Sequence, residues 1–232
     1  MPRVRAEATL VAQLRPTGAS QEAVLAELRR VLVSGRVRPG TQLPLDSIAR
    51  AFGVSRTPVR EALKTLLGEG LISHNHRGGY IVHAVNRNEF EELYTIRRAL
   101  EGAALGLAVA QADGAHHSAV QHSLTRQRTA LRSGDVAGWD VEGRAFHEAL
   151  VAACGMPRLS RLIRDAANST GTTRPMLRLP LARIEQLHAD HESMADAFVA
   201  GDTAGLQAAA ADHLERVRAW LLDTFDAGAV TD

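Results

Sequence analysis

The sequence has little cysteine, few aromatic residues and no long apolar run, and these shortages exclude several classes of protein. A single cysteine, Cys154, cannot form an internal disulfide, so a fold held together by disulfides is excluded. The shortage of cysteine agrees with a reducing cytoplasm. We expect Cys154 itself to be a small core residue. No apolar run approaches the roughly 18 residues of a membrane-spanning helix, and the N-terminus has no stretch of signal-peptide type. We therefore expect a soluble, cytoplasmic protein without a membrane partner.

The net charge of the chain is close to zero only because two regions of opposite sign cancel. Up to Arg87 there are 13 Lys and Arg against 6 Asp and Glu, whereas from Asn88 onward there are 14 against 20. A chain of 232 residues is long enough for two domains, and the change of sign suggests where they divide. The basic first third is the region expected to bind a polyanion.

The first third of the chain reads as three short helices and a β-hairpin. Residues 1–19 have no clear period and are expected to form a flexible arm. Ser20 can cap a first helix, residues 45–52 form a second, and Ser55 can cap a third. The short β-type runs LIS and YIVH then flank HNHRGG, which is typical of a hairpin. This order predicts a winged helix-turn-helix over residues 20–85.

The third of these helices combines an apolar face with a basic one. At about 100° per residue, the apolar stripe comprises Val59, Ala62, Leu63, Leu66 and Leu67. Cations near a helix N-terminus suit guanine edges or phosphates, and an arginine between glycines at a hairpin tip suits the minor groove. A basic face alone is more often merely solvated, but a preceding helix and a following hairpin favour DNA. The predicted DNA contacts are Ser55, Arg56, Thr57, Arg60, Lys64, Arg77, Gly78 and Gly79.

From residue 86 onward the pattern changes to long helices. Two Gly-Asp pairs each place a helix-ending glycine before a helix-capping aspartate, and breaks at proline and glycine separate the other segments. About six helices result, without strand-like alternation. Residues 86–226 are therefore expected to form an all-helical bundle followed by a tail at 227–232, and the fold class is mainly α.

Polar residues on these predicted helices are candidates for a binding site. Three histidines, His147, His191 and His213, each lie beside apolar neighbours, but scattered histidines are usually ordinary surface or core residues. Arg97 can pair with the carboxylate of a ligand or with Glu101 one helical turn later, and the sequence leaves both alternatives open.

The sequence resembles the GntR transcriptional regulators, in their FadR-like branch. The resemblance depends on LPLDSIARAFGVSRTPVREALKTLLGEGLI followed by GGYIV, and continues through IRRALEGAA, AFHEALVAACG and HESMADAFVAGD, so it covers nearly all of the chain from Ser20 to Leu222. It implies a winged-helix DNA-binding domain and an all-helical FCD domain that binds an effector. The family has an acidic or basic residue at the start of the second DNA-binding helix. This chain has Leu45 and Asp46 there, so we do not expect a DNA contact from Asp46.

The resemblance also bears on the histidines. In the FCD family the positions of His147, His191 and His213 hold metal ligands, together with an aspartate one turn before the first histidine. Here that position is Gly143, and Asp140 lies about 10 Å from His147 along the helix, too far to join the same ion. Three imidazoles suit Zn²⁺ or Ni²⁺ better than Mg²⁺ or Ca²⁺. Alternatively, no metal binds and the histidines donate to an anionic effector.

Together these observations predict a DNA-binding transcriptional regulator, most simply a repressor, and not an enzyme. A lone winged helix makes few base contacts, so a homodimer on palindromic operator DNA is expected. A small carboxylate-type metabolite is expected to modulate operator binding from a site formed by Arg97, His147, His191 and His213. A metal-dependent hydrolase using the three histidines is the alternative, although no glutamate has the H-E-x-x-H spacing. A DNA-packaging module would leave the acidic helical domain unexplained.

Overall fold

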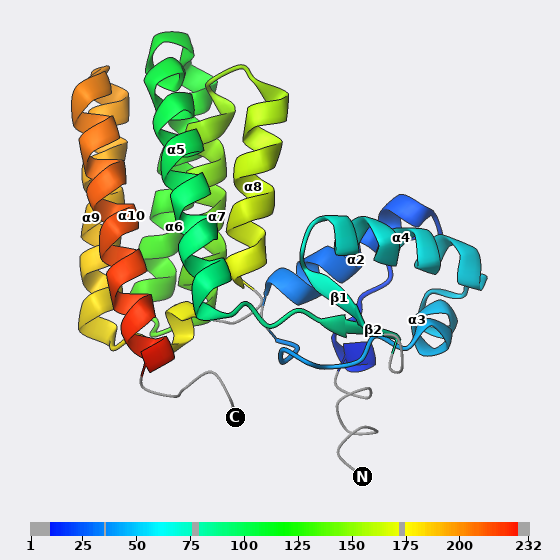
Figure 1. Ribbon diagram of the computed structural model, residues 1–232. Coiled ribbons are helices and arrows are strands. Elements are labelled where there is room, and N and C mark those ends of the chain that lie inside the picture. The colour runs from blue at the N-terminus through cyan, green and yellow to red at the C-terminus, as the bar shows by residue number, and fades with distance from the viewer. Residues whose placement is uncertain (1–9, 35, 76–78, 172–174, 227–232) are drawn as a thin grey trace. The chain divides into compact units, whose positions relative to one another are not determined.

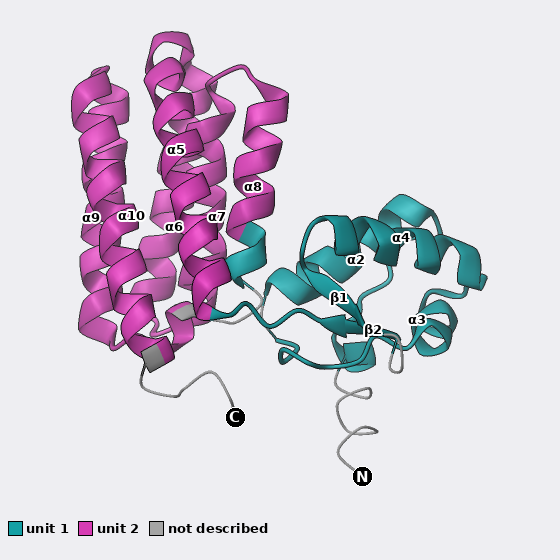
Figure 2. Ribbon diagram, viewed as in Figure 1, with its two compact units in different colours: residues 1–86, 168–174 teal, residues 87–167, 175–232 magenta. Residues whose placement is uncertain are grey.

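The computed structural model describes residues 10–34, 36–75, 79–171 and 175–226 (Figure 1). The chain forms two compact units, the first made of residues 1–86 with 168–174 and the second of 87–167 with 175–232 (Figure 2). The break after residue 86 follows the change in charge along the sequence. The sequence did not indicate that residues 168–171, the last turn of a long helix, belong to the first unit, where the Ser169 hydroxyl donates to the Glu69 carbonyl at 3.0 Å.

The first unit has the expected winged-helix elements. Ser20 caps the first helix by accepting a hydrogen bond from the Ala23 N–H at 3.1 Å. The two strands pair antiparallel with Ile72 opposite Val82, and a single bridge joins Gln42 to Ile81. The elements are α2 (Gln21–Val33), α3 (Leu45–Phe52), α4 (Arg56–Gly68), β1 (Ile72–Asn75) and β2 (Gly79–Val82).

The segment before α2 does not form the flexible arm that the sequence suggested, at least from residue 10 onward. Residues 10–13 form a helical turn, and Leu10 and Leu14 are buried in the core of the first unit. The buried carboxylate of Glu27 on α2 accepts a hydrogen bond from the Arg15 backbone N–H. Two leucines four residues apart therefore tie residues 10–15 to the domain, because burying them removes apolar surface from water. Residues 1–9 lie outside the described chain.

The described residues of the second unit form the expected bundle of six α-helices, which run side by side in Figure 1. Gly134 and Gly201 end helices with φ of 72° and 75°, and Asp135 and Asp202 cap the next ones by accepting from backbone N–H groups at 2.9 Å. Helix α6 packs on α7 and α9, and α10 packs on α5 and α9. The elements are α5 (Arg87–Gln111), α6 (Gly114–Arg132), α7 (Val136–Ala152), α8 (Pro157–Gly171), the 3₁₀ helix η1 (Pro175–Arg178), α9 (Leu181–Ala200) and α10 (Thr203–Asp226).

Two expectations from composition can be compared with this bundle. Cys154 is fully buried in the core of the second unit, as expected for a small core residue. Within the described ranges, no helix combines the length and the apolar character that crossing a membrane requires.

Candidate functional site

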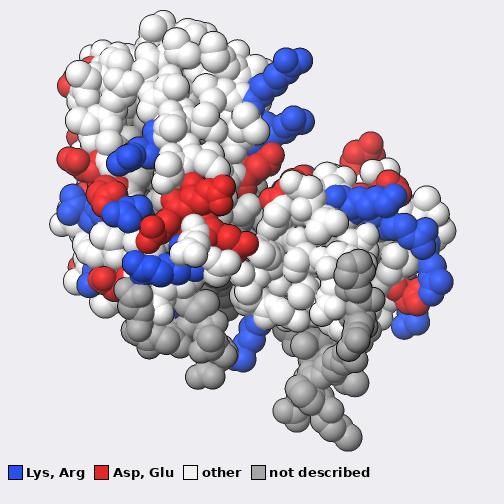
Figure 3. All heavy atoms as spheres, in the orientation of Figure 1, with Lys and Arg blue, Asp and Glu red and all other residues white. Residues whose placement is uncertain are grey.

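Helix α4 presents one face to the core and the other to solvent. Val59, Ala62, Leu63 and Leu66 are fully buried, whereas Leu67, which the helical stripe also included, is 39% exposed. The predicted stripe was one residue too wide, because Leu67 lies at its edge. The exposed side chains of α4 include Ser55 at the N-cap, Arg56, Thr57, Arg60 and Lys64. Figure 3 shows Lys and Arg side chains gathered over α3 and α4 on this face.

The cations of α4 differ in their partners within the protein. Nε and Nη2 of Arg56 donate to the two carboxylate oxygens of Asp46 at the start of α3, and this hydrogen bonding lowers the pKa of Asp46. Lys64 pairs with Glu61 at 2.9 Å. Arg60 has no ion-pair partner among the residues that the structure describes, so its guanidinium is available to DNA. All these groups are exposed, and exposed ion pairs contribute little to stability.

The predicted contacts at the hairpin tip lie mostly outside the described residues. Arg77 and Gly78 are not described, and Gly79 begins β2 with φ of 74°, a conformation that favours glycine. The left-handed backbone at Gly79 agrees with the tight turn that the GG pair predicted.

Within the second unit the structure brings the three predicted histidines together. His147 comes from α7, His191 from α9 and His213 from α10, and one ring nitrogen of each lies within 4.8 Å of the others. The Nε2 atoms of His191 and His213 are 3.3 Å apart. His191 and His213 are buried, with 2% and 4% of their surface exposed, whereas His147 is partly exposed. We refer to these three residues as the histidine centre.

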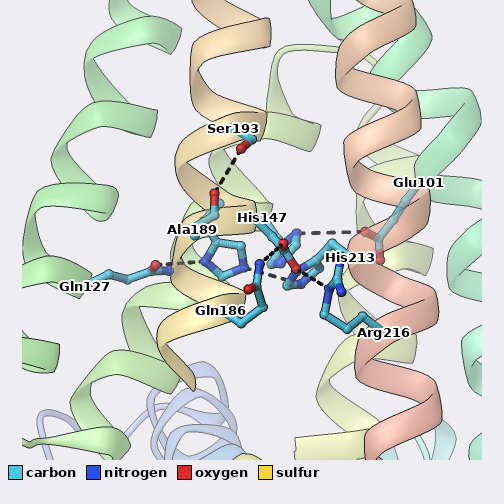
Figure 4. Close-up of polar contacts among 10 residues, drawn as sticks. Glu101, Gln127, His147, Gln186, Ala189, Ser193, His213 and Arg216 are labelled. Carbon is cyan, nitrogen blue, oxygen red and sulfur yellow. Dashed lines mark hydrogen bonds and ion pairs between the residues drawn. The ribbon is translucent and has the colours of Figure 1, made fainter. Parts of the chain in front are cut away.

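Behind each ring of the histidine centre an oxygen atom faces Nδ1 (Figure 4). The pairs are His191 with Gln127 Oε1 at 2.8 Å, His213 with Asp190 Oδ2 at 3.4 Å and His147 with Glu101 Oε2 at 4.0 Å. Metal-binding histidines commonly donate their other ring N–H to such an acceptor, which fixes the tautomer and orientation of the ring. For His191 and His213 this arrangement leaves Nε2 facing the middle of the centre, whereas the 4.0 Å between His147 Nδ1 and Glu101 is too long for a hydrogen bond.

Burial keeps two of these imidazoles neutral. It lowers the pKa of His147 and His191 well below the usual range. A neutral imidazole has a nitrogen lone pair and can bind a metal ion, whereas a protonated one cannot. Both rings are therefore in the metal-binding form at neutral pH.

Arg97 forms the internal ion pair that the sequence left as one of two alternatives. Its Nε donates to Glu101 Oε1 at 2.7 Å, and 8% of Arg97 and 2% of Glu101 are exposed. The guanidinium carbon also lies 5.1 Å from the centre of the Tyr94 ring, whose buried hydroxyl has its pKa raised to about 12 by burial. Since Glu101 also faces His147, Arg97 neutralises the carboxylate behind one ring of the histidine centre.

Gly143 lies beside the histidine centre, as the resemblance implied. A Cβ atom at this position would be 3.6 Å from His191 Cε1 and 3.1 Å from Gln127 Nε2. The amide of Gln127 therefore occupies the space next to the missing side chain. Asp140 instead pairs with Arg144 at 2.5 Å.

Sequence reasoning missed three residues of this site. Glu101 was considered only as a partner of Arg97, and Asp190 could have been suspected because it directly precedes His191. Gln127 gave no signal, since a single glutamine on a polar stretch of helix looks like a surface residue, yet it has 0% exposure.

Comparison with known proteins identifies the two units. Residues 92–216 match the FCD domain, and residues 20–82 match the bacterial regulatory proteins of the gntR family. The chain belongs to the GntR family. It is a DNA-binding transcriptional regulator with an FCD domain and not an enzyme, so the hydrolase alternative is set aside.

This GntR regulator is similar to several known transcriptional regulators. It is 26% identical over 195 residues to the transcriptional repressor GlaR of Escherichia coli, which covers 81% of this chain and 89% of GlaR. It is 30% identical over 129 residues to the regulator YdhC of Bacillus subtilis, covering 54% of this chain but only 56% of YdhC. The solved structure of E. coli McbR superposes with a TM-score of 0.81 at 25% identity, over 88% of this chain and 98% of McbR.

Proposed function

We propose that this regulator binds palindromic operator DNA as a homodimer in the cytoplasm, as a repressor, and that a small anionic effector at the histidine centre weakens this binding. The observation that carries the proposal is the convergence of three imidazoles in the helical unit, with ligand atoms within 4.8 Å of one another. A separate unit presents the exposed cations Arg56 and Arg60 on α4. GlaR, which is similar to this chain over most of its length, is a transcriptional repressor, and this supports the proposal that the chain represses transcription.

The histidine centre fits a transition-metal ion as part of the effector site. Zn–N bonds of about 2.0–2.1 Å at tetrahedral angles would place two ligand nitrogens about 3.3 Å apart. The Nε2 atoms of His191 and His213 have a separation of 3.3 Å. His147, with its ligand atom at most 4.8 Å from the others, would need a small rotation of its ring. Three neutral nitrogen donors suit Zn²⁺ or Ni²⁺.

The charges around the histidine centre favour an anionic effector. Glu101 is neutralised by Arg97, and Asp190 accepts from Arg216 Nε at 3.1 Å. With glycine at position 143, the described chain offers no further carboxylate beside the three rings. A divalent cation here would therefore keep most of its charge, which a carboxylate of the effector would balance. If no metal binds, the N–H groups of the histidines remain as donors to the same carboxylate.

The proposal can be tested with the full-length protein. Selection from random DNA is expected to enrich a palindromic site, and a screen of small carboxylates with and without Zn²⁺ is expected to find one that weakens operator binding about 5–150-fold. The readout is fluorescence anisotropy of labelled operator DNA. Failure of every carboxylate to change the affinity under both conditions would overturn the effector part of the proposal.

Replacing Arg60 by alanine is expected to lower operator affinity by about 1–3 kcal/mol, because Arg60 is exposed on α4 without a competing ion pair. The measurement compares the variant on operator and on random DNA, with Lys64→Ala as the control. Lys64 already pairs with Glu61, so its removal should weaken binding less and equally on both DNAs. An equal loss on both DNAs for Arg60→Ala would mean that Arg60 contacts phosphate and reads no base.

Replacing Gly143 by aspartate is expected to raise Zn²⁺ affinity about tenfold or more, because it adds a carboxylate beside His191. The new Cβ would lie 3.1 Å from Gln127 Nε2, the end of this amide without a hydrogen-bond partner, and a shift of a few tenths of an ångström would make room while Oε1 keeps its contact with His191. Titration calorimetry measures the change. Gly102→Asp is the matched control, since a Cβ at this helical position of α5 meets nothing within 4 Å. Equal affinities for both variants would show that α7 does not direct position 143 at the ion.

A further inference from the structure

We infer that Gln127, whose amide fills the space beside Gly143, has two roles: its amide oxygen fixes the ring of His191, and its amide nitrogen donates to an oxygen of the bound ligand. The second role rests on the proposed function, whereas the first can be tested without any ligand.

Gln127 lies on α6 and is fully buried, which is costly for an amide unless its polar atoms find partners. Its Oε1 is 2.8 Å from His191 Nδ1 and 3.3 Å from His188 Nδ1, so the oxygen is fully used. Its Nε2 has no hydrogen-bond partner in the described protein. The amide oxygen of Gln127 therefore bonds to histidines of α9, whereas its amide nitrogen is a buried donor without an acceptor.

The direction in which the amide points decides the chemistry of His191. With Oε1 toward the ring, Nδ1–H donates and the Nε2 lone pair faces the histidine centre. With the amide reversed, Nδ1 would accept, and Nε2 would have a hydrogen in the place of a metal ion. Nδ1 of His213 likewise faces Asp190 Oδ2 at 3.4 Å, and the Nε2 atoms of His191 and His213 are 3.3 Å apart. With both hydrogens on Nδ1, the two Nε2 lone pairs would face each other, and a cation between them would remove their repulsion.

The amide nitrogen of Gln127 that has no partner determines which kind of ligand group fits beside Gly143. It lies 3.1 Å from the position that a Cβ of residue 143 would take. One helical turn earlier on α7, Trp139 stacks on the His191 ring with centroids 5.6 Å apart, and its buried Nε1 also lacks a partner. An aspartate at position 143 would have been an acceptor, whereas Gln127 supplies an N–H donor at this place. Unpaired donors favour a ligand oxygen that has no hydrogen, such as that of a carboxylate.

The test for the first role measures the tautomer of His191 in the metal-free, full-length protein by ¹⁵N NMR of labelled histidine. The wild type is expected to have the proton on Nδ1, and Gln127→Met, which is similar in size but apolar, is expected to lose this preference. Its Zn²⁺ affinity should fall about 10–100-fold, as for other residues that orient metal ligands. Gln127→Glu keeps the acceptor oxygen and should bind Zn²⁺ at least as well as the wild type. Gln121→Met, an exposed change on the same helix, should alter neither property.

The test for the second role uses acetate as a small carboxylate probe of the Zn²⁺-loaded protein. The wild type is expected to bind acetate at least about tenfold more tightly than Gln127→Glu, which replaces the donor by a second carboxylate. Equal acetate affinities would overturn this role. A proton on Nε2 of His191 in the wild type, or unchanged Zn²⁺ binding by Gln127→Met, would overturn the first. Absence of Zn²⁺ binding by the wild type would instead remove the metal from the proposed function, and the tautomer would still decide the role of Gln127.

Discussion

Replacing Glu101 by leucine is expected to lower the free energy of unfolding of the helical unit by about 3–5 kcal/mol, because the buried guanidinium of Arg97 would lose its counter-ion. Both tryptophans of the chain, Trp139 and Trp220, belong to this unit. Tryptophan fluorescence during urea denaturation therefore follows the relevant transition separately from the winged helix.

A double variant separates charge from packing in this prediction. Arg97→Met with Glu101→Leu removes both buried charges together and should regain most of the stability lost in Glu101→Leu. Glu215→Gln is the control, because the pair of Glu215 and Arg218 on α10 is much more exposed and should contribute less than about 1 kcal/mol. A double variant no more stable than the single one would show that the two side chains matter through their packing.

Replacing His191 by alanine is expected to lower Zn²⁺ affinity more than about 100-fold, beyond the range for residues that only orient a ligand. His191 has the shortest contact of the histidine centre, 3.3 Å to His213, and loses its whole imidazole in this variant. Calorimetry at neutral pH gives the affinity. His122→Ala, on an exposed position of α6, controls for the general loss of a histidine and should bind as the wild type does.

The same variant also tests whether the metal ion and the effector occupy one site. If Zn²⁺ binds as tightly to His191→Ala as to the wild type, the ion sits elsewhere, and the three rings serve the effector directly or are core residues. If Zn²⁺ affinity falls but the carboxylate still releases operator DNA, metal and effector occupy different places.

The elements that the sequence predicted best are those with local signals. Helix α3 spans residues 45–52 as expected, because Gly53 ends it with φ of 64° and its apolar spacing is helical. The hairpin follows from glycines between two β-type runs. The three histidines could be grouped only through the resemblance to the FCD family, since nothing local connects residues on three different helices.

What the sequence could not provide depends on contacts between distant residues. Leu10 and Leu14 are buried because α2 and its neighbours offer a core to cover, which two leucines in an otherwise irregular stretch do not indicate. Arg97 had two possible kinds of partner, and only the burial of Glu101 beside it decides between them. Gln127 lies next to Gly143 through the packing of α6 on α7, so no spacing along the chain could have linked them.

The ion pair of Arg56 with Asp46 has a consequence for how the regulator would search DNA. Asp46 acts as an intramolecular competitor at a high local concentration, so any DNA gains from Arg56 only the difference between its own acceptors and that carboxylate. Phosphate oxygens and a guanine edge can both accept two hydrogen bonds from a guanidinium, so either can replace the carboxylate where its position allows both bonds. We therefore expect the pair to shorten the time that the regulator spends on any DNA that offers Arg56 fewer acceptors than Asp46 does.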